Sequence, residues 1–359
     1  MFAVSLLETH CAYNLTFLIF IPLTPISQIG KFGLTERISG AFMHKDASTI
    51  QGLGDDGTAA MYNSALSVSS QALFLEGTHF DLTYSPLKHV GYKAATRAIG
   101  QLMAMNAQPR QLLVAVGLSK RFFVEDVDQL FGGIEAACSS YGAELAGLDI
   151  DSSYTGLTLS ITALGEADSG SLASRRGARP TDLLCISGNL GAAYMGLQLL
   201  EREKSLFSSE STAQPQLQGK EYILQRYLRP VLRKELFELM QRDEIIPTSM
   251  CFLAQGLAQG VLALSQASGC GAKIFVDKIP IAAKTFEMAQ ELNFDALLCA
   301  LNGGDDYEFL FSIPLALHET VVRELPVDVI GHCCGADEGC CLVTPEGKAL
   351  PLQAPGWGE

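Results

Sequence analysis

Tryptophan and basic residues are both scarce in this chain of 359 residues, which has one Trp and only 25 Lys and Arg against 39 Asp and Glu. The resulting net charge of −14 argues against a nucleic-acid partner, because nucleic-acid-binding proteins need a basic surface that displaces counterions from phosphates. A small anionic ligand can still bind locally, through a metal ion or clustered backbone N–H groups. The composition therefore excludes one class of partner but not phosphorylated small molecules.

The sequence also lacks a hydrophobic run of membrane-spanning length. The apolar run over residues 15–23 is too short to cross a bilayer, and the first two dozen residues have neither a basic start nor a small-residue cleavage site. We therefore expect no membrane association. We expect the leading segment to be a loosely attached extension or the product of an ill-chosen start codon.

The ten cysteines show no C-x-x-C spacing and no regular pattern. A disulfide framework suits small secreted proteins, so reduced thiols in a cytoplasmic protein are the better interpretation. Cys333, Cys334, Cys340 and Cys341 could be read as four zinc thiolates. Adjacent cysteines on a strand point to opposite faces, however, which favours structural thiols near a hairpin.

Strand and helix patterns alternate from about residue 30 onward. In the first half, strands are expected near 65–77, 111–119, 143–150 and 155–167, with helices near 89–105 and 125–142. A basic, turn-rich segment, 172–182, looks like a boundary. Beyond it we expect a strand, a glycine turn and a helix over 182–200, a polar surface excursion over 205–219, further helices and strands, and a final hairpin. The pattern predicts an α/β (α+β) protein of two domains.

The glycine turn near residue 188 would point backbone N–H groups and a helix N-terminus at one spot. Such an arrangement favours an anion, although glycine turns between a strand and a helix are common and the signal is weak by itself.

Acidic residues recur in four glycine-bounded segments: GDDG, FLEGTHFD, GLDIDSS and NGGDDYEF. Carboxylates gathered from separate loops can hold hard divalent cations against a polyphosphate. The alternative is that Asp beside Gly simply forms turns. Two adjacent Asp pairs, one in GDDG and one in NGGDDYEF, shift the balance toward metal binding.

The ordered series GLGDDGTA, EGTHFDLTYSPLKHVGYKA, AMNAQP, AGLDIDSSYTGLTLSITALGEA, SRRGARPTDLLCISGNLGAAYMGLQLL and NGGDDYEFLF resembles the thiamine-monophosphate kinase family of the PurM-like superfamily. The resemblance covers the chain from about residue 30 to 357. It implies an extension over 1–29, an N-terminal PurM-like domain over 30–167 with a mixed sheet, and a C-terminal α/β domain over 168–359. It also implies a homodimer whose N-terminal sheets pair into a barrel.

The family's reaction transfers the γ-phosphoryl of ATP to thiamine phosphate and yields thiamine diphosphate, with Mg²⁺ held by aspartates. Because donor and acceptor are both anions, charge neutralisation and positioning carry most of the catalysis. The resemblance places residues of this chain in three roles. The metal positions are Asp55, Asp56, Ser70 and Asp149; the ATP positions are Leu148, Asp149 and Arg175; the substrate positions are His79, Asp305 and Trp357.

Several positions depart from the family's pattern. Its S-T-D-T-L, N-L-S-D and I-D-x-S-D-G-L motifs become SQALF, AIGQ and CFLAQGL here. The metal or nucleotide positions that lose their family residue are Ala72, Gln101, Phe252, Ala254 and Gln255. An amide oxygen ligates Mg²⁺ weakly, and alanine and phenylalanine side chains not at all. We expect these positions to surround Asp56 and Asp149 around a common centre.

Three hypotheses follow from the resemblance. The first is a family member with an impaired metal site and little or no catalysis. The second is an active ATP-dependent kinase with a rearranged site, in which Asp151 compensates for one lost acid. The acids that would hold fewer ions in that site are Asp55, Asp56, Asp149, Asp151, Asp305 and Asp306. The third is a non-catalytic protein that binds nucleotide or thiamine phosphate.

A different reaction on the same fold is a minor alternative. Hydrogenase-maturation relatives carry a reactive C-terminal cysteine, whereas this chain ends in GWGE, and selenophosphate synthetases carry a reactive Cys or selenocysteine with a nearby Lys, a pair that does not precede GLGDD here. Aminoimidazole ribonucleotide synthetases share the fold but not the segment FDLTYSPLKHVGYKA or the terminal Trp.

Overall fold

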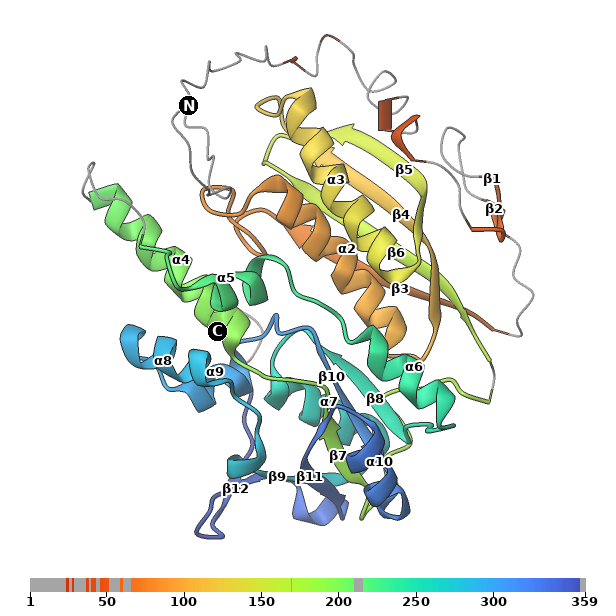
Figure 1. Ribbon diagram of the computed structural model, residues 1–359, viewed down its shortest axis with the longest axis vertical. Helices are drawn as coiled ribbons and strands as arrows, with labels where there is room; N and C mark the ends of the chain where they lie inside the picture. Colours follow the sequence, from red (N-terminus) through yellow and green to blue (C-terminus); the bar gives the residue numbers. More distant parts are fainter. Residues whose placement is uncertain are drawn as a thin grey trace, which may run out of the picture.

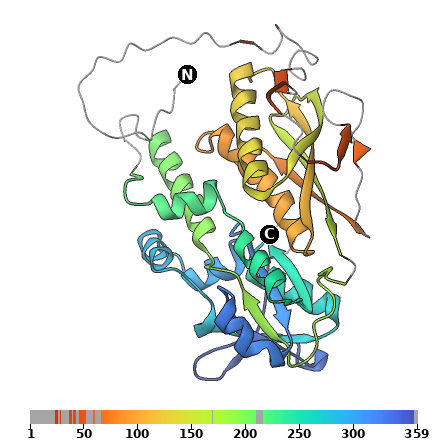
Figure 2. The same cartoon turned by 45° about the vertical axis from the view of Figure 1, so that its right-hand side comes forward.

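The computed structural model describes residues 24–25, 28, 37–38, 40–42, 46–51, 59–60, 66–168, 170–209 and 216–355. Two sheets dominate these residues, one above the other in the view of Figure 1 and again in the turned view of Figure 2. Two short antiparallel strands, β1 (Thr49–Gln51) and β2 (Ala59–Ala60), pair with each other and with neither of the two larger sheets. Along the chain the four-stranded sheet comes before the seven-stranded one.

The four-stranded sheet has the order β3-β6-β4-β5. Its strands are β3 (Leu66–Leu75), β6 (Thr158–Ala167), β4 (Gln108–Leu118) and β5 (Glu144–Ser152). β4 and β5 run parallel, and the other pairs are antiparallel, so the mixed sheet expected from the sequence is confirmed. The helices α2 (Leu87–Met103) and α3 (Val124–Tyr141) cover one face (Figure 1).

Two glycines let α2 and α3 pack closely. A Cβ on Gly91 of α2 would lie 2.0 Å from the carbonyl oxygen of Leu130, and one on Gly133 of α3 would lie 1.9 Å from that of Lys88. Any side chain there would push the two helices apart, because neither backbone carbonyl can move independently of its helix. The close crossing fixes α2, which carries much of the candidate site.

The seven-stranded sheet has the order β13-β12-β9-β11-β7-β10-β8, with every pair antiparallel except β12 and β9. Its strands are β7 (Leu183–Ile186), β8 (Ser249–Leu253), β9 (Gly271–Phe275), β10 (Glu308–Ile313), β11 (Asp328–Cys334), β12 (Cys340–Val343) and β13 (Ala349–Pro351). All side chains of β8 and β10 are buried, which explains their nearly continuous apolar sequence.

Helices cover the second sheet and extend beyond it (Figure 1). They are α4 (Ala192–Ser209), α5 (Glu221–Leu228), α6 (Lys234–Arg242), α7 (Leu257–Ser268), α8 (Ala283–Leu292), α9 (Ala296–Asn302) and α10 (His318–Glu324), with short 3-10 turns at Val276–Lys278, Leu315–Leu317 and Ala336–Glu338. α4 continues to Ser209, into the segment expected as a surface excursion. No Gly or Pro interrupts the chain there, so no stop signal ends the helix earlier.

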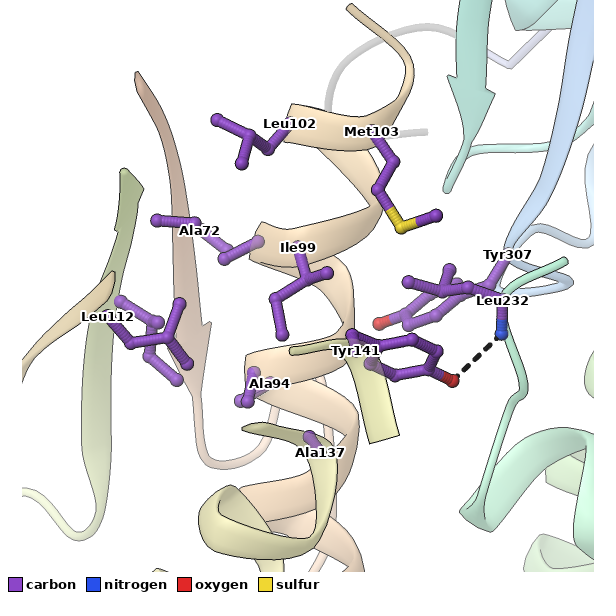
Figure 3. Packing of buried hydrophobic residues seen from close by; sticks show 14 of the residues in the cluster. Ala72, Ala94, Ile99, Leu102, Met103, Leu112, Ala137, Tyr141, Leu232 and Tyr307 are labelled. Carbon is purple, nitrogen blue, oxygen red and sulfur yellow. Dashed lines mark hydrogen bonds between the residues drawn. The ribbon is translucent and has the colours of Figure 1, made fainter. Parts of the chain in front are cut away.

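One hydrophobic cluster joins the two sheets. Ala72 and Ile99 of the first half and Tyr307 of the second belong to it (Figure 3). A hydrogen bond crosses the same junction, where the buried backbone N–H of Leu232 donates to the Tyr141 hydroxyl over 3.0 Å. The two halves therefore share buried apolar surface, and this holds the site residues on α2 against those on β8 and β10.

The described cysteines are all free thiols. Cys333 and Cys334 are successive residues of β11, and Cys340 and Cys341 are successive residues of β12. Within the described ranges, no three His, Cys, Asp or Glu side chains are arranged to hold a metal ion. Among the helices in those ranges, none combines the length and apolar character needed to cross a bilayer.

Candidate functional site

A cavity of about 610 Å³ opens between the two halves. β3 and α2 form one wall, and β8, the turn that follows it and α7 form the other. A loop around Arg175 and Arg176 borders the opening. The volume is within the range typical of small-molecule sites.

The first wall presents Ser70, Arg97 and Gln101 to the cavity. Arg97 and Gln101 are four residues apart on α2, so they lie on the same face of that helix. The Ser70 hydroxyl donates to the carbonyl oxygen of Ala98 over 2.7 Å and ties β3 to α2. Because this hydroxyl already donates a hydrogen bond within the fold, Ser70 has a structural role in addition to its predicted position at the metal site.

The second wall contains three of the positions that depart from the family pattern, namely Phe252, Ala254 and Gln255. The Phe252 ring packs against Tyr307 and Phe309, with ring centroids 5.0 and 5.6 Å apart. These aromatic contacts fix an apolar side chain at the end of β8. A divalent cation finds no ligand atom on that ring.

The loop at the mouth of the cavity is held by hydrogen bonds to its neighbours. The backbone N–H of Met250 donates to the Ser174 carbonyl over 2.7 Å, and the Ser268 hydroxyl donates to the Arg175 carbonyl over 2.9 Å. Gly177 has a φ of +118°, and a Cβ there would lie 2.3 Å from the Thr248 carbonyl oxygen. The two neighbouring arginines therefore project from an anchored backbone.

A second group of polar residues lies beside the cavity around His79, Lys93 and Asp305. The buried ammonium of Lys93 is 2.8 Å from the Asp305 carboxylate and 3.7 Å from the centre of the Tyr227 ring. Burial lowers the pKa of Lys93, while Asp305 opposes that shift. Burial and then the positive charge of Arg97 lower the pKa of His79, whose Nδ1 accepts from the Leu75 N–H. His79 is therefore neutral near pH 7. His79 and Asp305, both predicted from the sequence as substrate positions, lie close enough to interact electrostatically.

The N-terminus of α4 is occupied by the protein's own carboxylate. Asp306 accepts from the backbone N–H groups of Gly191 over 2.7 Å and Ala193 over 3.2 Å. Burial raises the pKa of Asp306 to about 7. The position at which the sequence suggests a bound anion is filled by an internal carboxyl group. The first turn of α4 is thus a structural contact rather than a free phosphate site.

The expected common centre for the acid positions is only partly found. Gln101, Phe252 and Gln255 line the cavity, but Ala72 does not and is buried in the apolar cluster facing α2 (Figure 3). Across the sheet, Ala72 is in register with Leu148 through Ile161 and Val114.

Asp149 follows Leu148 on β5, so its side chain points to the opposite face of the sheet and is exposed. β3 and β5 are also the two edge strands, three strand spacings or roughly 14 Å apart. Within one chain, positions 72 and 149 cannot share an ion, and that part of the expectation is wrong. Leu148 itself packs partly against the core.

Three predicted positions lie outside the described residues: Asp55, Asp56 and Trp357. Their assigned roles stay predictions. Of the remaining ATP positions, Arg175 lines the cavity and Asp149 does not.

Arg97 and Lys93 are site residues that the motif comparison did not single out. Both interrupt the alanine-rich segment KAATRAIG of α2. Burying a cation within an otherwise apolar helix costs free energy unless the cation has a partner or faces a polar cavity. The two basic residues in this apolar segment were therefore the sequence signal for a site.

The first half of the chain matches the family model described as "AIR synthase related protein, N-terminal domain" over residues 54–167. The thiamine-monophosphate kinase of Salmonella typhimurium is 31% identical over 293 residues, which are 79% of this chain and 83% of that protein. The chain belongs to the thiamine-monophosphate kinase family.

Solved structures of the family agree with this assignment. Thiamine monophosphate kinase from Aquifex aeolicus matches with a TM-score of 0.67 and 25% identity, over 80% of this chain and 90% of that one. A complex of AaThiL with AMPPCP and TMP matches with a TM-score of 0.68 and 25% identity, over 90% and 96% of the two chains. The expected α/β fold of the thiamine-monophosphate kinase family is therefore confirmed.

Proposed function

We propose that this member of the thiamine-monophosphate kinase family has lost most or all of the family's kinase activity through degradation of its metal site. The observation that carries the proposal is the chemistry of the cavity wall. None of the described residues that line the cavity is Asp or Glu. At the cavity wall, three positions where the family resemblance implies an acid carry the amides of Gln101 and Gln255 and the ring of Phe252 instead.

Transfer of a phosphoryl group between ATP and a second phosphate brings several negative charges together. Divalent cations held by carboxylates normally neutralise this charge and align the reacting oxygens. Gln101 and Gln255 offer neutral amide oxygens, and the Phe252 ring, which also lines the cavity, offers no ligand atom. A wall of this kind supports ligand binding better than catalysis.

An active kinase with a rearranged site is the second candidate. It is favoured by Asp149 and Asp151, which are both exposed and lie two residues apart on β5, hence on one face of that strand. Together with Asp55 and Asp56, they would have to hold Mg²⁺ without the acids lost at the cavity.

The remaining family features are part of the same proposal. We infer PurM-like domains over 30–167 and 168–359, supported by the two separate sheets. We also infer a cytoplasmic homodimer that pairs through the open face of the four-stranded sheet. The exposed Leu73 on that face and the free thiols of the described cysteines support this inference.

The deciding experiment incubates the purified full-length chain with ATP, Mg²⁺ and thiamine phosphate and measures thiamine diphosphate. The Salmonella typhimurium relative in the same assay serves as the positive control. We expect turnover at least about a thousandfold below the roughly 1 to 100 per second of ordinary kinases. Turnover within that ordinary range would refute the degraded-site proposal and establish the second candidate.

A restored variant tests the cause of the lost activity. It combines Gln101→Asp, Phe252→Asp and Gln255→Asp, and leaves Ala72 unchanged because that residue is buried in the apolar cluster and does not line the cavity. We expect Mg²⁺-dependent binding of ATP to increase in the restored protein, because carboxylates return to the cavity wall. Circular dichroism establishes that the variant is folded. A folded variant without any gain would show that the missing acids do not explain the loss.

A further inference from the structure

The described residues of the cavity wall carry positive charge and no negative charge. Arg97, Arg175 and Arg176 all line the cavity, and no Asp or Glu does so among the described residues. This local excess of positive charge contrasts with the chain's net charge of −14. A cavity of this charge attracts anions and repels divalent cations.

Among the described residues, these three arginines have no carboxylate partner, unlike Arg226 and Arg233. Arg226 and Arg233 both pair with the buried Glu308, at 3.0 and 2.9 Å. Within the described ranges, neither Arg97, Arg175 nor Arg176 forms an ion pair, and the Nε of Arg97 is buried without a hydrogen-bond partner. The guanidinium of Arg97 lies 5.5 Å from the centre of the Phe74 ring, a cation–π contact that uses no N–H donor. A buried N–H donor without a partner is unfavourable, so it favours a ligand that can accept from it.

The arrangement also matches the geometry of a polyphosphate. Guanidinium groups bind phosphate oxygens through paired, charge-assisted hydrogen bonds. Arg97 projects from α2, while Arg175 and Arg176 project from the anchored loop of the other half, so a ligand would contact both halves. The amides of Gln101, Gln255 and Gln259 and the Phe252 ring supply neutral polar and apolar surface for the remainder of the ligand.

We propose that this cavity binds a nucleoside di- or triphosphate in its metal-free form, with the three arginines supplying the positive charge that Mg²⁺ supplies in a kinase. The inference rests on the proposed function and specifies the ligand of the degraded site. Magnesium competes with the protein for the same phosphate oxygens and reduces the charge of the ligand. Metal ions therefore weaken binding at this site.

The test is isothermal titration calorimetry of the full chain with ATP and ADP at constant ionic strength, once with EDTA and once with excess MgCl₂. We expect binding in EDTA and a loss of affinity of about tenfold or more with Mg²⁺. Tighter binding with Mg²⁺, or no binding in EDTA, would overturn the proposal.

Variants assign the binding to the arginines. Arg97→Gln, and separately Arg175→Gln with Arg176→Gln, should each weaken metal-free binding by about tenfold or more, as expected for loss of hydrogen bonds to a charged group. Arg179→Gln is the matched control, because Arg179 is exposed in the same segment but does not line the cavity. Thermal melting without nucleotide establishes that each variant is folded. Unchanged affinity in both cavity variants would refute the assignment.

The outcomes separate this inference from the function on which it rests. Formation of thiamine diphosphate at an ordinary kinase rate refutes the degraded-site proposal, whatever the metal dependence of binding. Absent turnover together with Mg²⁺-dependent nucleotide binding refutes only the metal-free inference.

Discussion

The aromatic ring of Phe252 lies directly over the backbone of Gly100. A Cβ at Gly100 would be 2.5 Å from Cε2 of that ring, and even the methyl group of an alanine would collide with it. Both positions belong to motifs in which the chain departs from its family's pattern. The glycine on α2 and the phenylalanine on β8 are therefore one coupled packing solution rather than two independent changes.

This coupling can be measured with a double-mutant cycle. Gly100→Ala alone should lower the free energy of unfolding by about 1–3 kcal/mol because the added methyl overpacks the junction. In the Phe252→Ala background, which removes the ring, Gly100→Ala should cost much less, because the remaining close atom is Cδ2 of Leu232, at 2.9 Å, the end of a side chain that can shift. Urea unfolding gives the coupling energy, and purely additive effects would contradict the relationship.

A matched glycine serves as the control for that cycle. Gly132 lies on α3, and a Cβ there would meet no atom within 4 Å. Gly132→Ala should stabilise the protein by up to about 1 kcal/mol, because alanine is the better helix former and nothing opposes it.

The hydrogen bond between Tyr141 and Leu232 predicts a cost for removing one hydroxyl. In Tyr141→Phe the buried N–H of Leu232 loses its acceptor, and the contact with the Tyr92 hydroxyl at 3.1 Å is lost as well. We expect a loss of about 1–3 kcal/mol in the free energy of unfolding, measured by urea titration. Tyr154→Phe, at a fully exposed side chain, should change stability by less than about 0.5 kcal/mol. Equal effects of the two variants would refute the structural role of the bond.

Glu308 is buried between Arg226 and Arg233 and accepts from the Ser187 hydroxyl over 2.7 Å. Glu308→Gln removes the charge that compensates two guanidinium groups, so we expect a loss of about 3–5 kcal/mol. The control is Glu238→Gln on the surface of α6, where the pair with Lys234 contributes under about 1 kcal/mol. Urea denaturation gives the free energy of unfolding of both variants. A loss at Glu308 as small as that at Glu238 would contradict the expectation.

Asp306 should make stability depend on pH in a distinctive direction. Burial raises its pKa from 3.8 to about 7 in the folded protein, so folding favours the protonated carboxyl. Its contribution is complete below about pH 4 and is lost as pH rises toward 7, by up to about 1.4 kcal/mol per pH unit.

The Asp306→Asn variant isolates this contribution, because an amide does not titrate. Urea unfolding of wild type and variant across pH 4.5 to 7.5 should show that the stability difference between them shifts in favour of the variant as pH rises. Parallel profiles would refute a raised pKa at this carboxyl.

Local patterns along the chain were sufficient for much of the fold. Alternating apolar residues predict β3, and the periodic apolar face of residues 89–105 predicts α2 to within two residues at each end. These features depend on neighbouring residues only, since helix and strand periodicities are properties of the local backbone. The ordered motifs likewise indicate the family from sequence, and the departures at Gln101, Phe252 and Gln255 are visible in the letters alone.

Other features were decided by the tertiary structure, because they depend on residues distant in sequence. Strand register places Asp149 on the opposite face from Ala72, and no local pattern reveals that two edge strands lie three spacings apart. The hydrogen-bond acceptor at the α4 N-terminus is Asp306, more than a hundred residues away. The packing of the two halves likewise brings Arg97 to one cavity with Arg175, so the positive charge of the site arises from the fold and not from any single motif.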